Sequence, residues 1–99
     1  MAHVELGPRA VKDVRRAKRS GEGGRIEEAV ASLEREDQGL DIVPLQGRAP
    51  WRRMRSGDWR IIFRPLDAQE LRALGLKGSA YLVARIVNRR DLDRAVQNL

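Results

Sequence analysis

The sequence predicts a single α+β domain, with an N-terminal helical hairpin packed on one face of a small, mostly antiparallel sheet and a short C-terminal helix. Residues 8–20 and 25–37 carry apolar side chains at helical spacings of three and four, whereas residues 51–64 and 81–87 show the alternation and β-branched content of strands. A chain of 99 residues can bury about two-thirds of its unfolded surface. We therefore expect residues 1–99 to form one domain around a hydrophobic core.

The first half of the chain predicts a short strand and two helices. Residues 3–6 lean apolar, and Gly7-Pro8 then begins a helix, because a proline in the first turn lacks an N–H that would have no helical partner. A loop over residues 20–24 separates this helix from the second, for which Gly39 is the expected end. The apolar stripes of the two helices are Ala10, Val11, Val14 and Ala17, and Ile26, Ala29, Val30 and Leu33.

The middle of the chain predicts a strand and then a hairpin. Residues 42–45 lead into the first of these strands, and Ser56-Gly57-Asp58 forms the turn of the hairpin over residues 51–64. Residues 67–80 are expected to form either a long hairpin loop or a short helix around Leu71 and Leu74.

The last strand and helix follow. In residues 81–87 we expect Leu82, Ala84 and Ile86 to face the core. Asp91 can then cap a short C-terminal helix, because an aspartate side chain accepts hydrogen bonds from the first free N–H groups of a helix. The apolar set of that helix is Leu92, Ala95, Val96 and Leu99.

Arginines gather on one face of the predicted hairpin, which we call the arginine face. Side chains alternate along a strand, so Met54, Ile61 and Phe63 share the core face and the arginines lie opposite. We expect the arginine face to be open, with Arg85 of the last strand joining it and Arg89 and Arg90 at its rim. The net charge of +6 also indicates an anionic partner. The hairpin members of this face are Trp51, Arg53, Arg55, Arg60 and Arg64.

The composition excludes several classes of site. With no cysteine and one histidine, His3, the sequence offers neither disulfides nor a thiolate metal site, and we expect no metal and no cofactor. No stretch approaches the roughly 20 apolar residues of a membrane span. The first residues also lack the apolar region of a signal peptide. We therefore expect a cytoplasmic protein with no membrane partner.

Three segments, taken in order, resemble the RelE/ParE superfamily of toxins from type II toxin–antitoxin modules. They are Leu45-Gln46-Gly47, the hairpin from Arg53 to Arg64 with Gly57-Asp58-Trp59-Arg60 in it, and Val87-Asn88-Arg89-Arg90-Asp91. The resemblance spans nearly the whole chain and implies a RelE-like fold and a cognate antitoxin as partner. It implies a ribosome-dependent mRNA endoribonuclease that inhibits translation if the chain follows the RelE branch. The ParE branch implies a DNA gyrase inhibitor without catalysis.

The resemblance also implies roles for particular residues. In the RelE branch, basic side chains surround the scissile phosphate, and position by position these fall on Arg53, Arg55, Arg60 and Arg90. Metal-free RNA cleavage needs the extra charge of the phosphorane to be stabilised, and one fixed donor at such an oxyanion contributes roughly 2.7 to 4 kcal/mol. Arg60 and Arg90 are the best placed, at a strand start and a strand end. Arginine suits proton transfer poorly, because its pKa stays above about 12.

The residue that would transfer protons stays open. Asp93 and Val96 stand where ribonuclease members usually place a tyrosine or histidine. Asp93 joins the candidate catalytic set, with pairing to Arg90 as its alternative role, and Asp58 and Tyr81 are candidates more typical of a turn and a strand.

The remaining candidates are predicted to contact the ribosome, its rRNA or the mRNA. They are Arg52, Arg64, Arg85 and Arg89, together with Trp51, which either stacks on a base or covers the hairpin. We therefore favour the metal-independent ribonuclease. The ParE-like inhibitor, or a catalytically weak RNA-binding relative that an antitoxin neutralises, remains the alternative.

Overall fold

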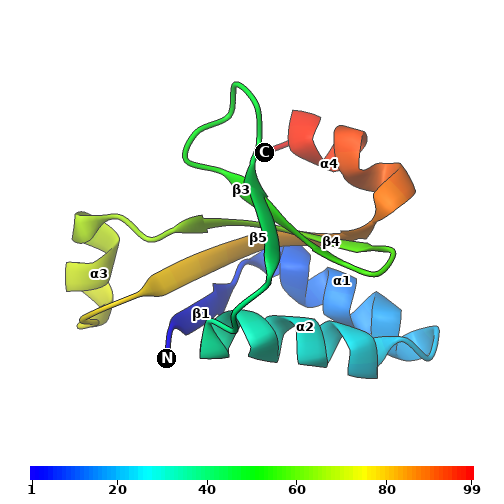
Figure 1. Cartoon of the computed structure of the whole chain (residues 1–99), viewed down its shortest axis with the longest axis horizontal. Helices are drawn as coiled ribbons and strands as arrows, with labels where there is room; N and C mark the ends of the chain where they lie inside the picture. The colour runs from blue at the N-terminus through cyan, green and yellow to red at the C-terminus, as the bar shows by residue number, and fades with distance from the viewer.

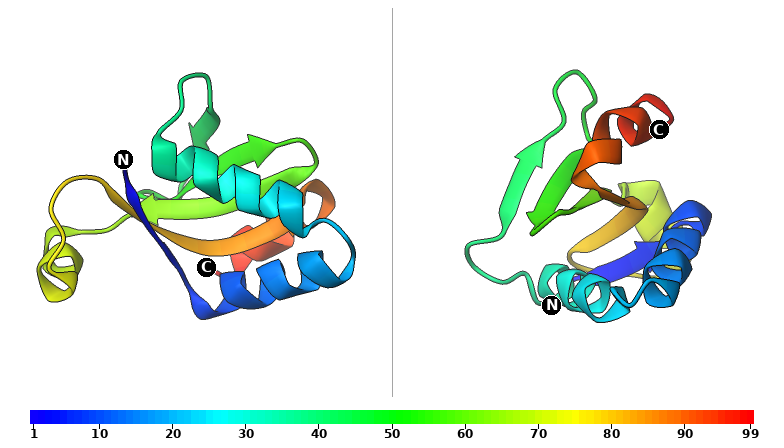
Figure 2. Two further views of the ribbon diagram at one scale, coloured as in Figure 1. Left: turned by 90° about the horizontal axis from the view of Figure 1, so that it is seen from below. Right: turned by 90° about the vertical axis from the view of Figure 1, so that its right-hand side faces the viewer.

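The computed structural model describes all of residues 1–99 as one five-stranded mixed sheet with helices on both sides. The sheet order is β1-β5-β4-β3-β2, in which β1 and β5 are parallel and the other neighbours antiparallel. Helices α1 and α2 cover one face and α4 lies against the other (Figure 1; Figure 2). The elements are β1 (His3–Leu6), α1 (Pro8–Arg19), α2 (Gly23–Arg35), β2 (Asp41–Pro44), β3 (Arg52–Ser56), β4 (Trp59–Pro65), α3 (Ala68–Leu74), β5 (Ala80–Asn88), a 3₁₀ turn (Arg89–Asp91) and α4 (Leu92–Gln97). The predicted fold class is confirmed, and none of the helices has the length and apolar character needed to cross a bilayer.

The main core lies between the helical hairpin and the centre of the sheet. Ile61 and Phe63 of β4 are almost completely buried, as the alternation in the sequence predicts. They pack with Met54 of β3 against Ile26 and Leu33 of α2. Each such side chain contributes roughly 1.5 to 3 kcal/mol when it leaves water. These contacts fix the β3–β4 hairpin against the helices, so the alternate side chains of the hairpin lie on the opposite face of the sheet.

A bulge in β5 corrects the predicted facing of that strand. Ile62 pairs with Arg85 and Phe63 pairs with Val83, which leaves Ala84 between them without a partner on β4. An extra residue reverses the alternation beyond it. The core side chains of β5 are therefore Val83 and Ile86. The expectation that Leu82 and Ala84 face the core is wrong.

The same bulge places Tyr81 in the main core. The Tyr81 ring meets Phe63 edge-on, with ring centroids 5.4 Å apart. The Tyr81 hydroxyl donates to the Glu36 carboxylate at 3.4 Å. Tyr81 therefore lies on the helix side of the sheet and not on the arginine face.

A second, smaller core covers part of the face that the sequence predicts to be open. Ile62 of β4, Val87 of β5 and Ala95 of α4 are buried together there. The β2–β3 loop and α4 close over them with four partly buried side chains: Leu45, Trp51, Leu92 and Val96. The prediction of an open face is wrong because Ile62 and Val87 give this face an apolar centre, which the apolar side of α4 covers.

The connection over residues 67–80 contains a helix, which settles the two alternatives that the sequence left open. Asp67 caps α3: its side chain accepts the Glu70 N–H at 2.8 Å, and the Glu70 side chain accepts the Asp67 N–H at 3.0 Å. This reciprocal pair satisfies two N–H groups that a helix start leaves free. Gly75 ends the helix in the left-handed region.

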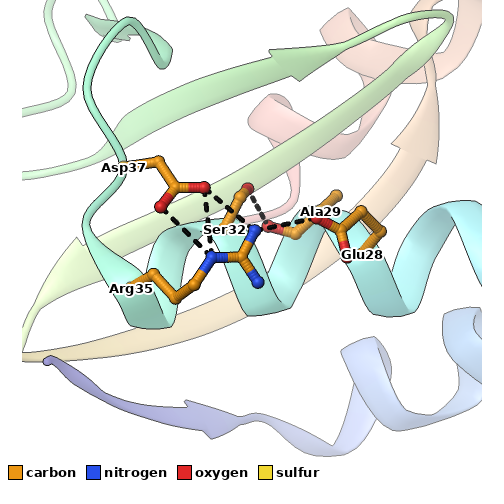
Figure 3. Close-up of polar contacts among 5 residues, drawn as sticks. All are labelled: Glu28, Ala29, Ser32, Arg35 and Asp37. Carbon is orange, nitrogen blue, oxygen red and sulfur yellow. Dashed lines mark hydrogen bonds and ion pairs between the residues drawn. The ribbon is translucent and has the colours of Figure 1, made fainter.

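The end of α2 is fixed by an exposed polar cluster rather than by Gly39. Glu36 adopts a left-handed conformation with φ of 53° and closes the helix. Arg35 donates to Asp37 and to Glu28 at 2.8 to 3.2 Å, and the Ser32 hydroxyl donates to the Ala29 carbonyl (Figure 3). The two carboxylates raise the pKa of Arg35. The helix therefore ends at Arg35, earlier than the sequence predicts.

A buried ion pair joins α1 to the free edge of β5. Asp13 is only 6% exposed, and its carboxylate accepts two bonds from the Arg85 guanidinium, at 2.9 and 3.2 Å, and one from the Ile86 N–H, at 2.8 Å. Strand β1 pairs with β5 only as far as Val83, so Asp13 provides the acceptor that a neighbouring strand would provide to Ile86. Arg85 therefore turns towards α1, and the expectation that it joins an open arginine face is wrong.

We predict that Asp13→Ala lowers the free energy of unfolding by about 3 to 5 kcal/mol, because it leaves Arg85 largely buried without a counter-charge. Urea denaturation measures the loss. Asp13→Leu combined with Arg85→Met should recover part of it, because the double variant buries no charge but still leaves the Ile86 N–H without an acceptor. Glu28→Ala, which breaks the exposed pair in Figure 3, is the control and should change little. Equal effects of Asp13→Ala and Glu28→Ala would contradict the prediction.

Candidate nucleic-acid interface

Four arginines meet at the tip of the β3–β4 hairpin, and we call them the tip cluster: Arg53, Arg55, Arg60 and Arg89. Arg55 and Arg60 are direct neighbours across the two strands. Arg89 follows β5 and is brought to the hairpin turn by its backbone N–H, which donates to the Asp58 carbonyl at 2.8 Å. Its side chain lies 3.8 Å from the Asp58 carboxylate. The tip cluster is therefore assembled from two segments about 30 residues apart in the sequence.

Arg60 is the most constrained member of the tip cluster. Its guanidinium has no acidic partner and donates to the carbonyls of Gly57 and Trp59, at 2.9 and 3.0 Å. Partial burial lowers the pKa of Arg60, and the charges of Arg53, Arg55 and Arg89 lower it further. Like charges held this close make the site favourable for an anion, since an added negative charge relieves their repulsion.

Asp41 offsets part of the charge of the tip cluster. Its carboxylate lies 3.1 Å from Arg53 and 3.3 Å from Arg55. The pairing of β2 with β3 sets Asp41 opposite Arg55. No sequence pattern indicated Asp41, because the register of β2 on β3 depends on how the loop between them closes, which no motif specifies.

Arg64 and Trp51 lie at the other end of the hairpin and are engaged within the protein. Arg64 donates to both oxygens of Glu70 on α3, at 2.7 and 2.9 Å. Its guanidinium carbon lies 5.5 Å from the centre of the Trp51 ring, a cation–π contact. Trp51 also packs on the second core. The structure thus places Trp51 as a lid over the hairpin, one of its two expected positions.

The other sequence candidates are dispersed. Arg52 shares the face of Met54, where its charge acts on Tyr81, whose pKa is raised chiefly by burial. Asp93 is exposed on α4 and makes no ion pair, whereas its neighbours Asp91 and Arg94 pair at 2.8 Å. Arg89, and not Arg90, is the neighbour whose charge acts on Arg60.

Arg90 lines a groove that crosses the free edge of β5. The groove has a volume of about 540 Å³ and runs between α1 on one side and the 3₁₀ turn with α4 on the other. The Asp13–Arg85 pair lies in it, and Trp59 lines it beside the tip cluster. Arg9 bridges its walls by donating to the Asn98 carbonyl at 3.1 Å. The sequence signal for this buried acid was the position of Asp13 between Ala10 and Ala17, within the apolar stripe of the first helix.

Neither metal-binding groups nor the usual proton-transfer groups gather at the tip cluster. No three carboxylate or imidazole side chains are grouped as a metal site requires. His3 pairs with Glu5 on β1 at 2.6 Å, and Tyr81 is in the main core. Of the residue types that commonly transfer protons, only the carboxylates of Asp41 and Asp58 contact arginines of the cluster.

The arrangement of elements matches several solved structures. The YafQ toxin of Escherichia coli, in its complex with DinJ, superposes with a TM-score of 0.65 at 18% identity, over 92% of this chain and 96% of that one. RelBE2 of Mycobacterium tuberculosis gives 0.61 at 20% identity, over 88% and 96%. An archaeal RelE–RelB complex from Pyrococcus horikoshii gives 0.59 at 19% identity, over 89% and 94%. The chain has the RelE-type fold.

The RelE-type fold confirms the architecture that the resemblance implies. No protein-family model and no curated protein sequence matches the chain. In this RelE-type fold, the tip cluster lies at the end of the hairpin and next to the residues that follow the last strand. These are the two segments on which the resemblance placed Arg53, Arg55, Arg60 and Arg90.

We predict that the Arg64–Glu70 pair makes stability sensitive to acid. Arg64 and the Asp67 N–H lower the pKa of Glu70 to about 2, from an ordinary value of 4.5. A carboxyl with a lowered folded-state pKa adds stability above its unfolded pKa and loses it as the pH falls through the folded one. The difference in unfolding free energy between wild type and Glu70→Gln should therefore shrink between about pH 6 and about pH 2 in urea titrations. A difference that does not vary with pH would show that the pair adds no stability.

Proposed function

We propose that the chain is the toxin of a type II toxin–antitoxin system and acts in the cytoplasm as a ribosome-dependent, metal-independent mRNA endoribonuclease. The observation that carries the proposal is Arg60, which is partly buried, lacks an acidic partner and lies among arginines. A protein seldom holds like charges together unless an anion binds there. The RelE-type fold and the complexes of YafQ with DinJ and of RelE with RelB support the toxin role.

The chemistry assigned to the tip cluster is electrostatic. When the 2′-oxygen attacks the neighbouring phosphorus, the phosphorane gains negative charge and the bond to the leaving 5′-oxygen breaks. Arg60 is fixed by the Gly57 and Trp59 carbonyls, so its remaining N–H groups can bind a phosphate oxygen without reorganisation. Arg53, Arg55 and Arg89 surround it and bind the flanking phosphates. In this assignment, Arg90 binds the strand as it leaves the cluster.

The arginines of the tip cluster do not account for proton transfer in this reaction. Arginine as a residue type is a poor general base at neutral pH, because a guanidinium group does not release its proton there. A dedicated acid or base typically accounts for roughly 10² to 10⁴ in rate. The ribosome dependence that we propose is consistent with this gap, since groups on the bound RNA or the ribosome would then have to accept the proton of the 2′-hydroxyl and supply a proton to the leaving 5′-oxygen.

The same gap favours a second candidate, a ParE-like gyrase inhibitor that does no chemistry. Its supporting observation is that neither Tyr81 nor His3 belongs to the tip cluster: Tyr81 is partly buried on the helix side of the sheet, and His3 lies on β1, an edge strand that β5 separates from β4. Primer extension on mRNA translated in a purified system distinguishes the two. We expect cuts within codons at the ribosomal A site, whereas intact mRNA combined with inhibited DNA supercoiling would establish the gyrase inhibitor.

We predict that Arg60→Ala and Arg90→Ala each abolish growth inhibition and leave the thermal midpoint almost unchanged. Arg60 loses two hydrogen bonds to the turn but also escapes the repulsion of its neighbours, so the net effect on folding is small. Arg53→Ala and Arg55→Ala should have milder effects, mainly on RNA affinity and its salt dependence. Arg72→Ala, an exposed arginine on α3, removes the same charge and should remain toxic.

Asp93→Asn tests proton transfer directly. Asp93 makes no contact with the tip cluster, so we expect near-normal toxicity. A loss as large as that of Arg60→Ala would assign Asp93 to the reaction. Full toxicity in all four arginine variants would overturn the ribonuclease proposal and leave the gyrase inhibitor.

We further predict that a cognate antitoxin covers the tip cluster or displaces α4, with acidic residues opposite the arginines. Complementary charge chiefly raises the association rate, which salt then screens. Stopped-flow mixing should show association that slows between low and high salt while dissociation changes less. An association rate that salt leaves unchanged would exclude an electrostatic interface.

A further inference from the structure

The groove between α1 and α4 carries positive charge that the tip cluster does not account for. Five arginines and three acids line it. Two of the acids are consumed within the protein, because Asp13 pairs with Arg85 and Asp91 pairs with Arg94. The arginines that remain are Arg9, Arg16 and Arg90, against the single acid Glu22. None of these three arginines forms an ion pair, so the groove has a net positive charge available to an anion.

The groove is continuous with the tip cluster. Trp59 lines the groove and is followed directly by Arg60. Arg89 and Arg90 both lie in the 3₁₀ turn that follows β5. Arg89 belongs to the tip cluster, whereas Arg90 lines the groove. An anionic polymer held at the tip cluster would therefore meet the groove as its next positive surface.

The lining also has the composition that suits an unpaired nucleotide. Alongside the arginines it includes the partly exposed Trp59, together with Ala17 and Ile86, which are almost fully buried in the main core. The exposed part of an aromatic ring can bind the face of a base, and arginine binds phosphate. The volume of about 540 Å³ lies in the range of pockets that hold a small ligand, so the groove can accept part of one strand but not a duplex.

We propose that the groove binds the single RNA strand where it extends beyond the tip cluster, with Arg16 and Arg90 on its phosphates. The inference rests on the proposed ribonuclease function and adds the path of the substrate to it. An acidic peptide is the other occupant that the charge would permit. RNA is favoured because the groove begins at the site proposed for the scissile phosphate.

Binding of non-cleavable 2′-O-methyl RNA to the full chain tests the proposal. One fluorescent RNA of about 4 nucleotides spans the tip cluster only, and one of about 12 reaches the groove. The variants are Arg16→Glu, in the groove, and Arg15→Glu, exposed on the same helix but outside the groove. Both reverse one charge, so they alter the overall field of the protein equally. Arg60→Ala reports on the tip cluster.

We expect the longer RNA to bind more tightly, with a salt slope steeper by roughly 1.4, since Arg16 and Arg90 contact two phosphates at about 0.7 each. Arg16→Glu should weaken the longer RNA roughly tenfold relative to Arg15→Glu and leave the shorter one unchanged. Equal effects of the two variants on the longer RNA would overturn the groove proposal while Arg60→Ala still weakens both RNAs. Arg60→Ala without effect on either RNA would overturn the proposed function itself. Loss of antitoxin binding in Arg16→Glu, with RNA binding intact, would assign the groove to an acidic peptide and overturn the proposal.

Discussion

The contact of Asp13 with Arg85 and with the Ile86 N–H attaches α1 to the part of the β5 edge that β1 does not cover. Beyond Val83, no strand covers the edge of β5, so the Ile86 N–H needs an acceptor from another element. Helix α1, which packs beside this edge, also needs a contact that fixes its position on β5. One carboxylate serves both purposes. Because Asp13 is almost fully buried, the position of α1 along β5 is fixed. The groove and the strand end that carries Arg89 and Arg90 follow from that position.

The acids of the chain divide the arginines into two groups. Arg64, Arg85 and Arg35 each meet a carboxylate that raises the pKa of the guanidinium, and each attaches one element to another or closes a helix end. Arg60 has the opposite electrostatics: its pKa is lowered, and its hydrogen bonds go to neutral carbonyls. A site that disfavours its own charge gains the most from an incoming phosphate. The groups that accept hydrogen bonds from the guanidinium, neutral carbonyls for Arg60 and carboxylates for Arg35, Arg64 and Arg85, therefore distinguish Arg60 from these three structural arginines.

Much of the fold could be predicted from the sequence because its periodicity is strong. The apolar stripes of the two helices and the alternation through Ile61 and Phe63 are local signals, and the structure confirms both. The bulge at Ala84 leaves no local signal, and it changed the facing of Leu82 and Tyr81 together, whereas Arg85 left the predicted arginine face because it pairs with Asp13. The covered face was missed for a related reason: Ile62 and Val87 stand apart in the sequence, and only the pairing of β4 with β5 makes them one apolar patch. Arginines could be assigned to a surface from alternation alone, but their partners Asp13, Asp41 and Glu70 lie 6 to 72 residues away.

The short helix α4 connects the proposed activity to its proposed neutralisation. Its apolar side covers Ile62 and Val87, and its polar side forms one wall of the groove. An antitoxin helix that replaced α4 would need to supply the same apolar contacts, since otherwise Ile62 and Val87 would be exposed at a cost of roughly 1.5 to 3 kcal/mol each. Such a replacement would also remove the groove wall and carry acidic residues towards Arg16 and Arg90. In the proposed function, neutralisation would then act by rebuilding the RNA path as well as by blocking the tip cluster, so an antitoxin segment could block the proposed activity without contacting Arg60.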